Sequence, residues 1–253
     1  MGKGKKKKGN VILIAVGVVV VVAAFLLINP IRSLIAISTM SPLKSQEIVT
    51  GVYAINNGFV NLYLLQNGNQ YIAFDAGNDN EATMRALDDF GIDSDDVSAV
   101  FLTHTDADHV AAVSLFTSAD VYMAESNQTF LLTDEGQSRS KVFADMNRGY
   151  GTLSDGETIT VKGAQIQCIY TPGHTDGSAC YVVNGIYLFT GDNLNLNNGK
   201  VVLFVDVFNM NNDEQSQSIR KLSRLEGIEA LFTMHSGYTT DFKTAFSEWD
   251  TQD

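Results

Sequence analysis

The chain alternates short apolar runs with polar turns, and this pattern predicts the order of its elements. Runs rich in β-branched and aromatic residues that end at Gly, Asn or Asp indicate strands. The predicted strands are residues 46–55, 59–65, 70–74, 97–103, 119–124, 157–161, 165–171, 179–183, 186–190 and 230–234. Helical spacing predicts helices over residues 80–90, 110–116 and 212–225, whereas residues 125–150 are polar and are expected to be irregular. Strands at both ends with helices between them favour two sheets that are covered by helices on their outer faces.

The N-terminal segment combines a lysine cluster with a long apolar run. Val11–Ile28 is uncharged over 18 residues and would reach about 27 Å as a helix, close to the roughly 30 Å of a hydrocarbon core. We expect a basic cytoplasmic tail over residues 1–10, a transmembrane anchor over 11–29 and a linker over 30–45. Because the lysines precede the run, the positive-inside rule makes this a single-pass protein of the cell membrane with its domain outside. A cleaved signal peptide is the alternative, although its apolar core is usually about 7–15 residues long.

The charge of the chain is strongly asymmetric. The formal net charge of the 253 residues is −12, and all 29 Asp and Glu lie after residue 39, together with only 11 of the 17 Lys and Arg. Such an acidic surface repels phosphate backbones, so nucleic acid is not an expected partner. The length of residues 46–253 predicts one domain with a full hydrophobic core.

The two cysteines, Cys168 and Cys180, are equally spaced about His174. A hairpin centred there would place them on neighbouring strands, which leaves a disulfide open. Two buried thiols that act as small apolar residues are the favoured interpretation.

All four histidines of the chain follow predicted strands, and carboxylates accompany them. The turn after residues 97–103 holds four potential ligands within six residues, and three later turns add one ligand each. The candidates are His104, Asp106, Asp108, His109, His174, Asp192 and His235. Imidazole and carboxylate together suit zinc, iron or manganese. The sequence therefore predicts a metal centre built from the ends of strands.

These motifs resemble those of the metallo-β-lactamase fold superfamily over about residues 46–240. The family pattern H-x-H-x-D-H corresponds to His104-Thr-Asp106-Ala-Asp108-His109. The later motifs that look like the family's are Thr171-Pro-Gly-His174, Thr190-Gly-Asp192 and Met234-His235-Ser236-Gly237, and the Asp75-Ala-Gly77 turn is similar to its Asp-Thr-Gly. The resemblance implies an α/β fold, a four-layer αββα sandwich over residues 46–253, with a two-metal site at the edge between its sheets.

The resemblance also implies a role for each candidate ligand. One divalent ion would take His104, Asp106 and His174, the other would take Asp108, His109 and His235, and Asp192 would bridge both. A metal-bridged hydroxide, oriented by Asp108 as the catalytic residue, would attack an ester, lactone, amide or phosphoester bond of a small molecule. Zinc is the expected metal.

Asp106 departs from the family pattern, because most hydrolytic members carry His at this position. A carboxylate shifts metal preference from zinc toward iron or manganese. Diiron flavoproteins of the same fold carry Glu there, so a diiron redox or oxygen-sensing protein is the alternative function. Asp is also shorter than Glu, which allows a weak or empty site. A non-catalytic binding module is the third hypothesis.

Substrate contacts are only weakly indicated. Lys200, Asn193 and Asn195 lie near Asp192 in sequence and would suit a substrate carboxylate, although a solvated loop is the favoured interpretation. Tyr238 is a further candidate, with packing as its alternative role.

Overall fold

The structure is a computed structural model that describes residues 30–249. It divides into one unit that ends at Thr39 and a second that begins at Met40. The predicted cytoplasmic tail and transmembrane anchor, residues 1–29, lie outside the described residues. Within residues 30–249, no helix has the length and apolar character needed to cross a bilayer.

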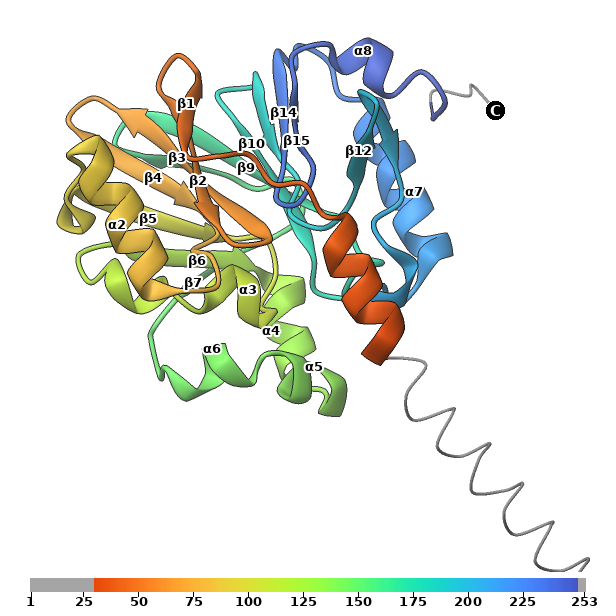
Figure 1. Ribbon diagram of the computed structural model, residues 1–253, viewed down its shortest axis with the longest axis horizontal. Helices are drawn as coiled ribbons and strands as arrows, with labels where there is room; N and C mark the ends of the chain where they lie inside the picture. Colours follow the sequence, from red (N-terminus) through yellow and green to blue (C-terminus); the bar gives the residue numbers. More distant parts are fainter. Residues whose placement is uncertain (1–29, 250–253) are drawn as a thin grey trace, which may run out of the picture. The chain divides into compact units, whose positions relative to one another are not determined.

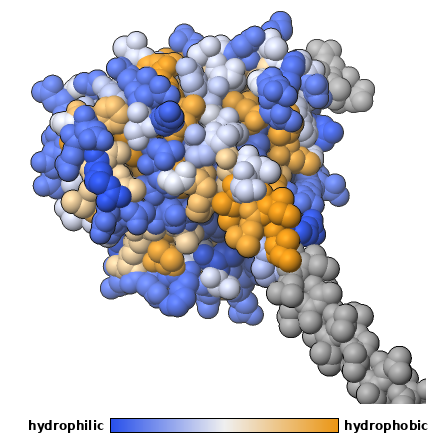
Figure 2. Space-filling view, viewed as in Figure 1, coloured by the Kyte–Doolittle hydropathy of each residue, from blue (hydrophilic) through white to orange (hydrophobic). Residues whose placement is uncertain are grey.

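The first part of the predicted linker is a helix. Residues 30–39 are helical, and their large exposed apolar side chains are Ile31, Leu34 and Ile35. These residues follow i, i+3, i+4 spacing and so lie on one side of the helix, where they give the apolar surface visible in Figure 2.

The second part of the predicted linker, residues 40–45, belongs to the second unit. Ser41 donates its backbone N–H to the carbonyl of His235 over 2.8 Å. Leu43 donates its N–H to the Asn61 side chain over 2.7 Å. These hydrogen bonds tie residues 40–45 to the second unit.

Two β-sheets form the body of the second unit (Figure 1). The first sheet has seven strands in sequence order: β1 Gln46–Val49, β2 Val52–Asn57, β3 Val60–Asn67, β4 Gln70–Phe74, β5 Val97–Leu102, β6 Asp120–Ala124 and β7 Gly151–Leu153. The second sheet has the order β15-β14-β11-β10-β9-β8, with β8 Thr158–Val161, β9 Ala164–Tyr170, β10 Ala179–Val183, β11 Tyr187–Phe189, β14 Ala230–Thr233 and β15 Gly237–Thr239. A two-stranded ribbon pairs β12 Asn195–Asn197 with β13 Lys200–Val202.

Helices cover the outer faces of the two sheets. Within residues 40–249 the α-helices are α2 Asn80–Phe90, α3 Ala107–Val110, α4 Glu125–Leu131, α5 Asp134–Arg139, α6 Lys141–Asp145, α7 Asn212–Ser223 and α8 Phe242–Ala245. The same residues include three short 3₁₀ turns, η1 Ser94–Asp96, η2 Val113–Leu115 and η3 Asp206–Phe208. Figure 1 shows α2 and α7 on opposite sides of the pair of sheets.

Side-chain alternation along the strands separates three cores. On β3, Tyr63 and Leu65 enter the central core between the sheets, whereas Leu62 and Leu64 enter the outer core beneath α2. A second outer core lies between the other sheet and α7. This layering confirms the predicted αββα sandwich.

Several predicted elements coincide with the structure because their boundaries carry local signals. β4, β10 and α2 occupy the predicted residues. Asp79 caps α2 by accepting the Ala82 N–H over 2.7 Å, and Gly91, with φ 66°, ends the helix. The predicted strand over residues 46–55 is instead a hairpin, since Gly51 adopts φ 77° and the chain turns between β1 and β2.

The expectation of irregular structure over residues 125–150 is wrong in part, because this stretch forms α4, α5 and α6. The helices are short and are fixed by tertiary contacts and caps. Thr133, for example, accepts the Gly136 N–H over 3.0 Å at the start of α5. The predicted helix over residues 110–116 is two shorter turns, because α3 begins earlier, at Ala107, and η2 follows it.

The cysteines lie on opposite faces of the second sheet. Cys168 pairs with Tyr181 and Cys180 pairs with Ile169, so the one-residue offset sends Cys168 into the central core and Cys180 into the core beside α7. Both are free thiols, and burial raises the pKa of each to about 12. The structure thus supports two buried thiols, which stay protonated at neutral pH.

Candidate metal centre

The candidate ligands leave the carboxyl ends of strands that meet at one edge of the sandwich. His104 follows β5, and later ligands follow β9, β11 and β14. β11 and β14 are parallel, and β9 runs the same way as β11 because each pairs antiparallel with β10. The Tyr181 hydroxyl donates to the Leu102 carbonyl over 2.9 Å, which joins the two sheets at this edge. The carboxyl ends of these strands therefore place ligands from both sheets at one edge of the sandwich.

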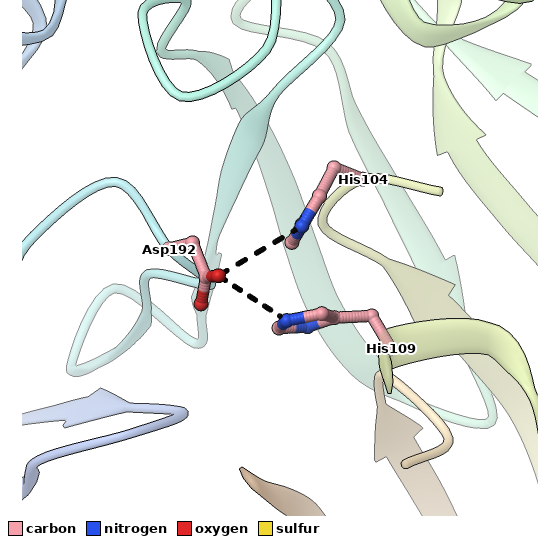
Figure 3. A group of neighbouring side chains, drawn as sticks. All are labelled: His104, His109 and Asp192. Carbon is pink, nitrogen blue, oxygen red and sulfur yellow. Dashed lines mark ion pairs between the residues drawn. The ribbon is translucent and has the colours of Figure 1, made fainter. Parts of the chain in front are cut away.

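Asp192 lies at the middle of the four imidazoles. Figure 3 shows His104 and His109 turned toward its carboxylate, with Nε2–Oδ2 distances of 4.0 and 3.4 Å. His174 Nε2 lies 3.6 Å from Oδ2, and His235 Nε2 lies 3.2 Å from Oδ1. A single carboxylate thus faces the Nε2 atom of every histidine in the chain.

Asp106 forms one triad with His104 and His174, which we call the Asp106 triad. Asp106 Oδ2 lies 3.3 Å from His174 Nε2 and 3.7 Å from His104 Nε2. The ligand atoms of these three residues lie within 4.8 Å of one another. One cation can contact all three.

Asp108, His109 and His235 form a second triad, the Asp108 triad. Asp108 Oδ2 lies 3.5 Å from His235 Nε2 and 3.6 Å from His109 Nε2, and these ligand atoms also lie within 4.8 Å of one another. The structure thus brings together all seven residues that the sequence singled out.

Hydrogen bonds at Nδ1 orient the two histidines of the first ligand turn. His109 Nδ1 lies 2.8 Å from Asp75 Oδ2. His104 Nδ1 lies 3.0 Å from Thr103 Oγ1, whose hydroxyl donates to Asp75. Because the carboxylate only accepts and the Thr103 proton is already donated, both imidazoles carry their proton on Nδ1. Their Nε2 atoms then face the centre.

The other two histidines follow strands of the second sheet and are oriented in the same way. His235 Nδ1 lies 2.6 Å from the Phe59 carbonyl, and His174 Nδ1 lies 3.2 Å from Asn209 Oδ1. Asn209 is held in turn by Gln215, whose amide N–H donates to it over 3.1 Å. Supporting hydrogen bonds of this kind fix both the tautomer and the direction of a metal-binding imidazole.

Four buried atoms at the centre lack a hydrogen-bond partner among the described residues: Nε2 of His104, His109 and His235, and Oδ1 of Asp192. Burying a polar atom without a partner is costly unless something else satisfies it. These atoms converge, and their chemistry is that of zinc ligands. The residues present therefore fit a divalent cation.

The buried carboxylates and imidazoles shift one another's pKa. Burial lowers the pKa of His109, but Asp192 and Asp108 outweigh it and raise that pKa well above its usual value. Burial, together with His109, lowers the pKa of His104. Burial raises the pKa of Asp192, yet His235 and His109 hold it well below its usual range. The centre keeps Asp192 ionised and so favours positive charge.

Arg139, the last residue of α5, enters the centre and was not predicted from the sequence. Its Nε donates to Asp106 Oδ1 over 3.0 Å, and its Nη2 donates to Asp106 Oδ2. Nη2 also lies 3.3 Å from His174 Nε2, and Nη1 donates to the Phe208 carbonyl over 3.2 Å. Burial raises the pKa of Asp106, but His174, His104 and this guanidinium hold it well below its usual range.

The segment that carries Arg139 is tied to the first ligand turn. The Thr105 and Ser140 hydroxyls lie 2.6 Å apart, and the Thr105 hydroxyl also contacts Asn127 Oδ1 at 3.3 Å. Thr105 and Ser140 are the residues next to Asp106 and Arg139 in sequence. No strand precedes Arg139, so the strand-end rule that found the other residues gives no signal for it.

Three of the four residues considered as substrate contacts have structural roles. Lys200 donates to the Thr244 carbonyl over 2.9 Å and to the Ser247 hydroxyl over 2.7 Å, which directs it to α8. The buried Asn193 donates to the Thr171 carbonyl over 2.8 Å. Tyr238 packs against the central core. Lys200 therefore has partners other than a substrate carboxylate, and packing accounts for Tyr238.

Comparison with known families and proteins agrees with this geometry. Residues 55–235 match the family model described as the metallo-beta-lactamase superfamily. A protein of Bacillus velezensis named as a probable polyketide biosynthesis zinc-dependent hydrolase is 35% identical over 100 residues, which cover 38% of this chain and 39% of the relative. The chain thus matches well under half the length of this curated relative.

Solved structures share the fold. A metallo-beta-lactamase family protein from Thermus thermophilus has a TM-score of 0.60 at 24% identity, covering 80% of this chain and 79% of that one. The flavodiiron protein from Giardia intestinalis has a TM-score of 0.59 at 16% identity, covering 83% of this chain and 59% of that one. At these identities the likeness concerns the fold alone.

Proposed function

The chain belongs to the metallo-beta-lactamase superfamily, and from this premise we propose that it is a zinc-dependent hydrolase of a small molecule. The Asp106 triad and the Asp108 triad would each hold one divalent ion, with Asp192 shared between them. The observation that carries the proposal is the convergence of buried, unpartnered Nε2 atoms around one ionised carboxylate. The two cations together would satisfy all of these atoms.

When bound, divalent zinc supplies a hydrolytic nucleophile at neutral pH and polarises the bond to be cleaved. The chain's residues hold and orient the reactants. Asp108 is the carboxylate of the first ligand turn that remains 23% exposed, whereas Asp192 is only 5% exposed. Asp108 can therefore accept a proton from water at the open side of the centre, while Asp192 stays a buried ligand.

The bond class that we propose is an ester, lactone, amide or phosphoester. A pocket of about 560 Å³ beside Arg139 is lined by Glu135, Val207, Phe208, Asn209 and Met210. Asn209 also orients His174, so this pocket adjoins the Asp106 triad. Its apolar side chains suit the uncharged part of a substrate. The curated relative acts in polyketide biosynthesis by its name, which supports a small organic substrate here.

Removal of metal and replacement of Asp108 test the function. Zinc content and turnover of ester, lactone and phosphodiester substrates are measured on the full chain before and after chelation. Turnover should disappear with the metal and return with zinc. Asp108→Ala should lower it by at least about 100-fold, since the change removes a proton acceptor.

Asp145→Ala is the matched control, because Asp145 is 64% exposed and pairs with Lys141 at the surface. It should keep wild-type turnover. Hydrolysis that persists without metal, or in Asp108→Ala, would contradict the proposed function.

A diiron redox protein is the second candidate, and the carboxylate of Asp106 is the observation that favours it. A carboxylate in place of an imidazole shifts the preference of a site from zinc toward iron, and the fold is shared with a flavodiiron protein. Metal analysis of the purified chain separates the two candidates. Iron with a visible ligand-to-metal absorption supports the redox protein, and zinc supports the hydrolase.

We further propose that the lysine cluster and the apolar run of residues 11–28 anchor the chain in the cell membrane with the domain outside. Protease added to intact cells should then remove the domain while the chain partitions with membranes. A soluble product with a new N-terminus near residue 39 would indicate a cleaved signal peptide instead.

A further inference from the structure

The guanidinium of Arg139 lies where a cation bound by the Asp106 triad would lie. Nη2 donates to Asp106 Oδ2 and lies 3.3 Å from His174 Nε2. Asp106 Oδ2 and His174 Nε2 are themselves 3.3 Å apart and belong to the same ligand group. Nε engages the other oxygen of Asp106, Oδ1, over 3.0 Å. Both carboxylate oxygens are thus taken by one positively charged fork.

A guanidinium and a divalent cation cannot share these atoms. Arginine stays charged, and a zinc ion bonds to its nitrogen and oxygen ligands at about 2.0–2.2 Å. A second cation between Asp106 and His174 would therefore both clash with Nη2 and be repelled by its charge. Binding of metal at the Asp106 triad requires Arg139 to leave.

The Asp108 triad carries no such competitor in the described part of the chain. Asp108 Oδ2 faces His235 and His109 at 3.5 and 3.6 Å, and the ion pairs of Arg139 and Lys141 go to Asp106 and Asp145. The Nε2 atoms of His109 and His235 have no hydrogen-bond partner, whereas His174 Nε2 contacts Arg139. The two halves of the centre are chemically unequal.

Arg139 has an alternative ion-pair partner within its own helix. Glu135 lies one helical turn earlier on α5 and already acts on the charge of Arg139. Both residues line the pocket of about 560 Å³ that adjoins the centre. A displaced guanidinium can pair with Glu135 there at the cost of its hydrogen bonds to Asp106 and the Phe208 carbonyl.

We propose that Arg139 competes with metal for the Asp106 triad, so that the chain binds one divalent ion tightly at the Asp108 triad and a second more weakly at the Asp106 triad. The inference rests on the proposed metal centre but not on hydrolysis. It makes Arg139 a determinant of metal stoichiometry. The second ion enters only when its concentration is high enough to displace the guanidinium.

Titration of zinc into the metal-free full chain tests this inference without any measurement of activity. The wild type should bind two ions with dissociation constants that differ by about 10-fold or more. Arg139→Gln should strengthen the weaker event by about 10-fold and leave the tighter one unchanged. Arg139→Lys keeps the charge but loses the two-point fit to Asp106, and so should give an intermediate affinity.

Two controls assign the effect. Arg85→Gln removes the same charge from the surface, where Arg85 is 68% exposed and pairs with Glu81, and should change neither event. His174→Ala should abolish the weaker event alone, and in that background Arg139→Gln should have no further effect. Circular dichroism verifies that each variant is folded.

Two equal binding events in the wild type would overturn the inference. So would weaker binding of the second ion in Arg139→Gln, because that result would mean that Arg139 supports Asp106 as a ligand instead of competing for it. If both events behave as expected but no substrate is hydrolysed, the inference stands and the proposed function fails.

Discussion

Replacement of Asp192 by Asn should remove both metal ions from the chain at zinc concentrations that saturate the wild type. Asp192 is the residue that faces both triads, with His235 and His109 at 3.2 and 3.4 Å and His174 at 3.6 Å. Asn keeps the shape of the side chain but loses its charge and one acceptor oxygen. Either change weakens the binding of a cation that depends on this carboxylate.

The expected loss in zinc affinity is at least about 100-fold, because even residues that only support metal ligands contribute roughly 10- to 100-fold. Turnover should fall in parallel, since both ions are affected. Zinc content after dialysis gives the number of ions that the variant retains. A titration of the metal-free variant gives its zinc affinity. Asp145→Asn, the same chemical change at an exposed position, should match the wild type.

This expectation contrasts with that for Arg139, which acts on one triad only. A variant at position 192 that lost a single ion would show that Asp192 serves one metal and does not bridge two. Such a result would leave the Asp108 triad and Asp106 triad as independent sites. Zinc stoichiometry alone distinguishes the two outcomes.

The centre was predictable from the sequence because its ligands obey one rule. Each follows a short apolar strand, and parallel strands place their carboxyl ends at the same edge of a sheet. His104, His174 and His235 satisfy this rule on β5, β9 and β14. The fold was predictable for a related reason, since the alternation of side chains along these strands sorts them into central and outer cores.

Arg139 was not predictable, because its place in the centre depends on contacts that lie outside its own segment. Residues 125–150 have few apolar positions to give helical periodicity, and α5 spans only Asp134–Arg139. The hydrogen bond between Thr105 and Ser140 joins positions 35 residues apart. Tertiary contact, and not local pattern, decides what this segment does.

The cysteines illustrate a similar limit. Their symmetric spacing about His174 left open whether they face each other, because spacing does not fix the register of a hairpin. The turn places Cys180 opposite Ile169 and not opposite Cys168. Because side chains alternate with a period of two, this shift of one residue puts the thiols on opposite faces of the sheet.

Replacement of Gly191 by Ala should destabilise the domain and disturb the centre together. Gly191 adopts φ +56°, and a Cβ there would lie 2.4 Å from Thr103 Oγ1 and 2.6 Å from Thr103 Cβ. Thr103 cannot move freely, since its hydroxyl donates to Asp75 over 2.8 Å and contacts His104 Nδ1 at 3.0 Å. The clash therefore reaches both histidines of the first ligand turn, because Asp75 also holds His109.

Gly68→Ala separates the clash from backbone strain. Gly68 adopts a similar φ of +65°, but nothing lies within 4 Å of its Cβ position. It should cost about 1 kcal/mol of unfolding free energy from the backbone alone, whereas Gly191→Ala adds roughly 1–3 kcal/mol for overpacking. Urea unfolding of the metal-free proteins compares the two without the stabilisation that bound metal adds. Zinc affinity should fall in Gly191→Ala and stay unchanged in Gly68→Ala. If the two variants lose equal unfolding free energy and equal zinc affinity, Thr103 moves aside without displacing His104 and His109.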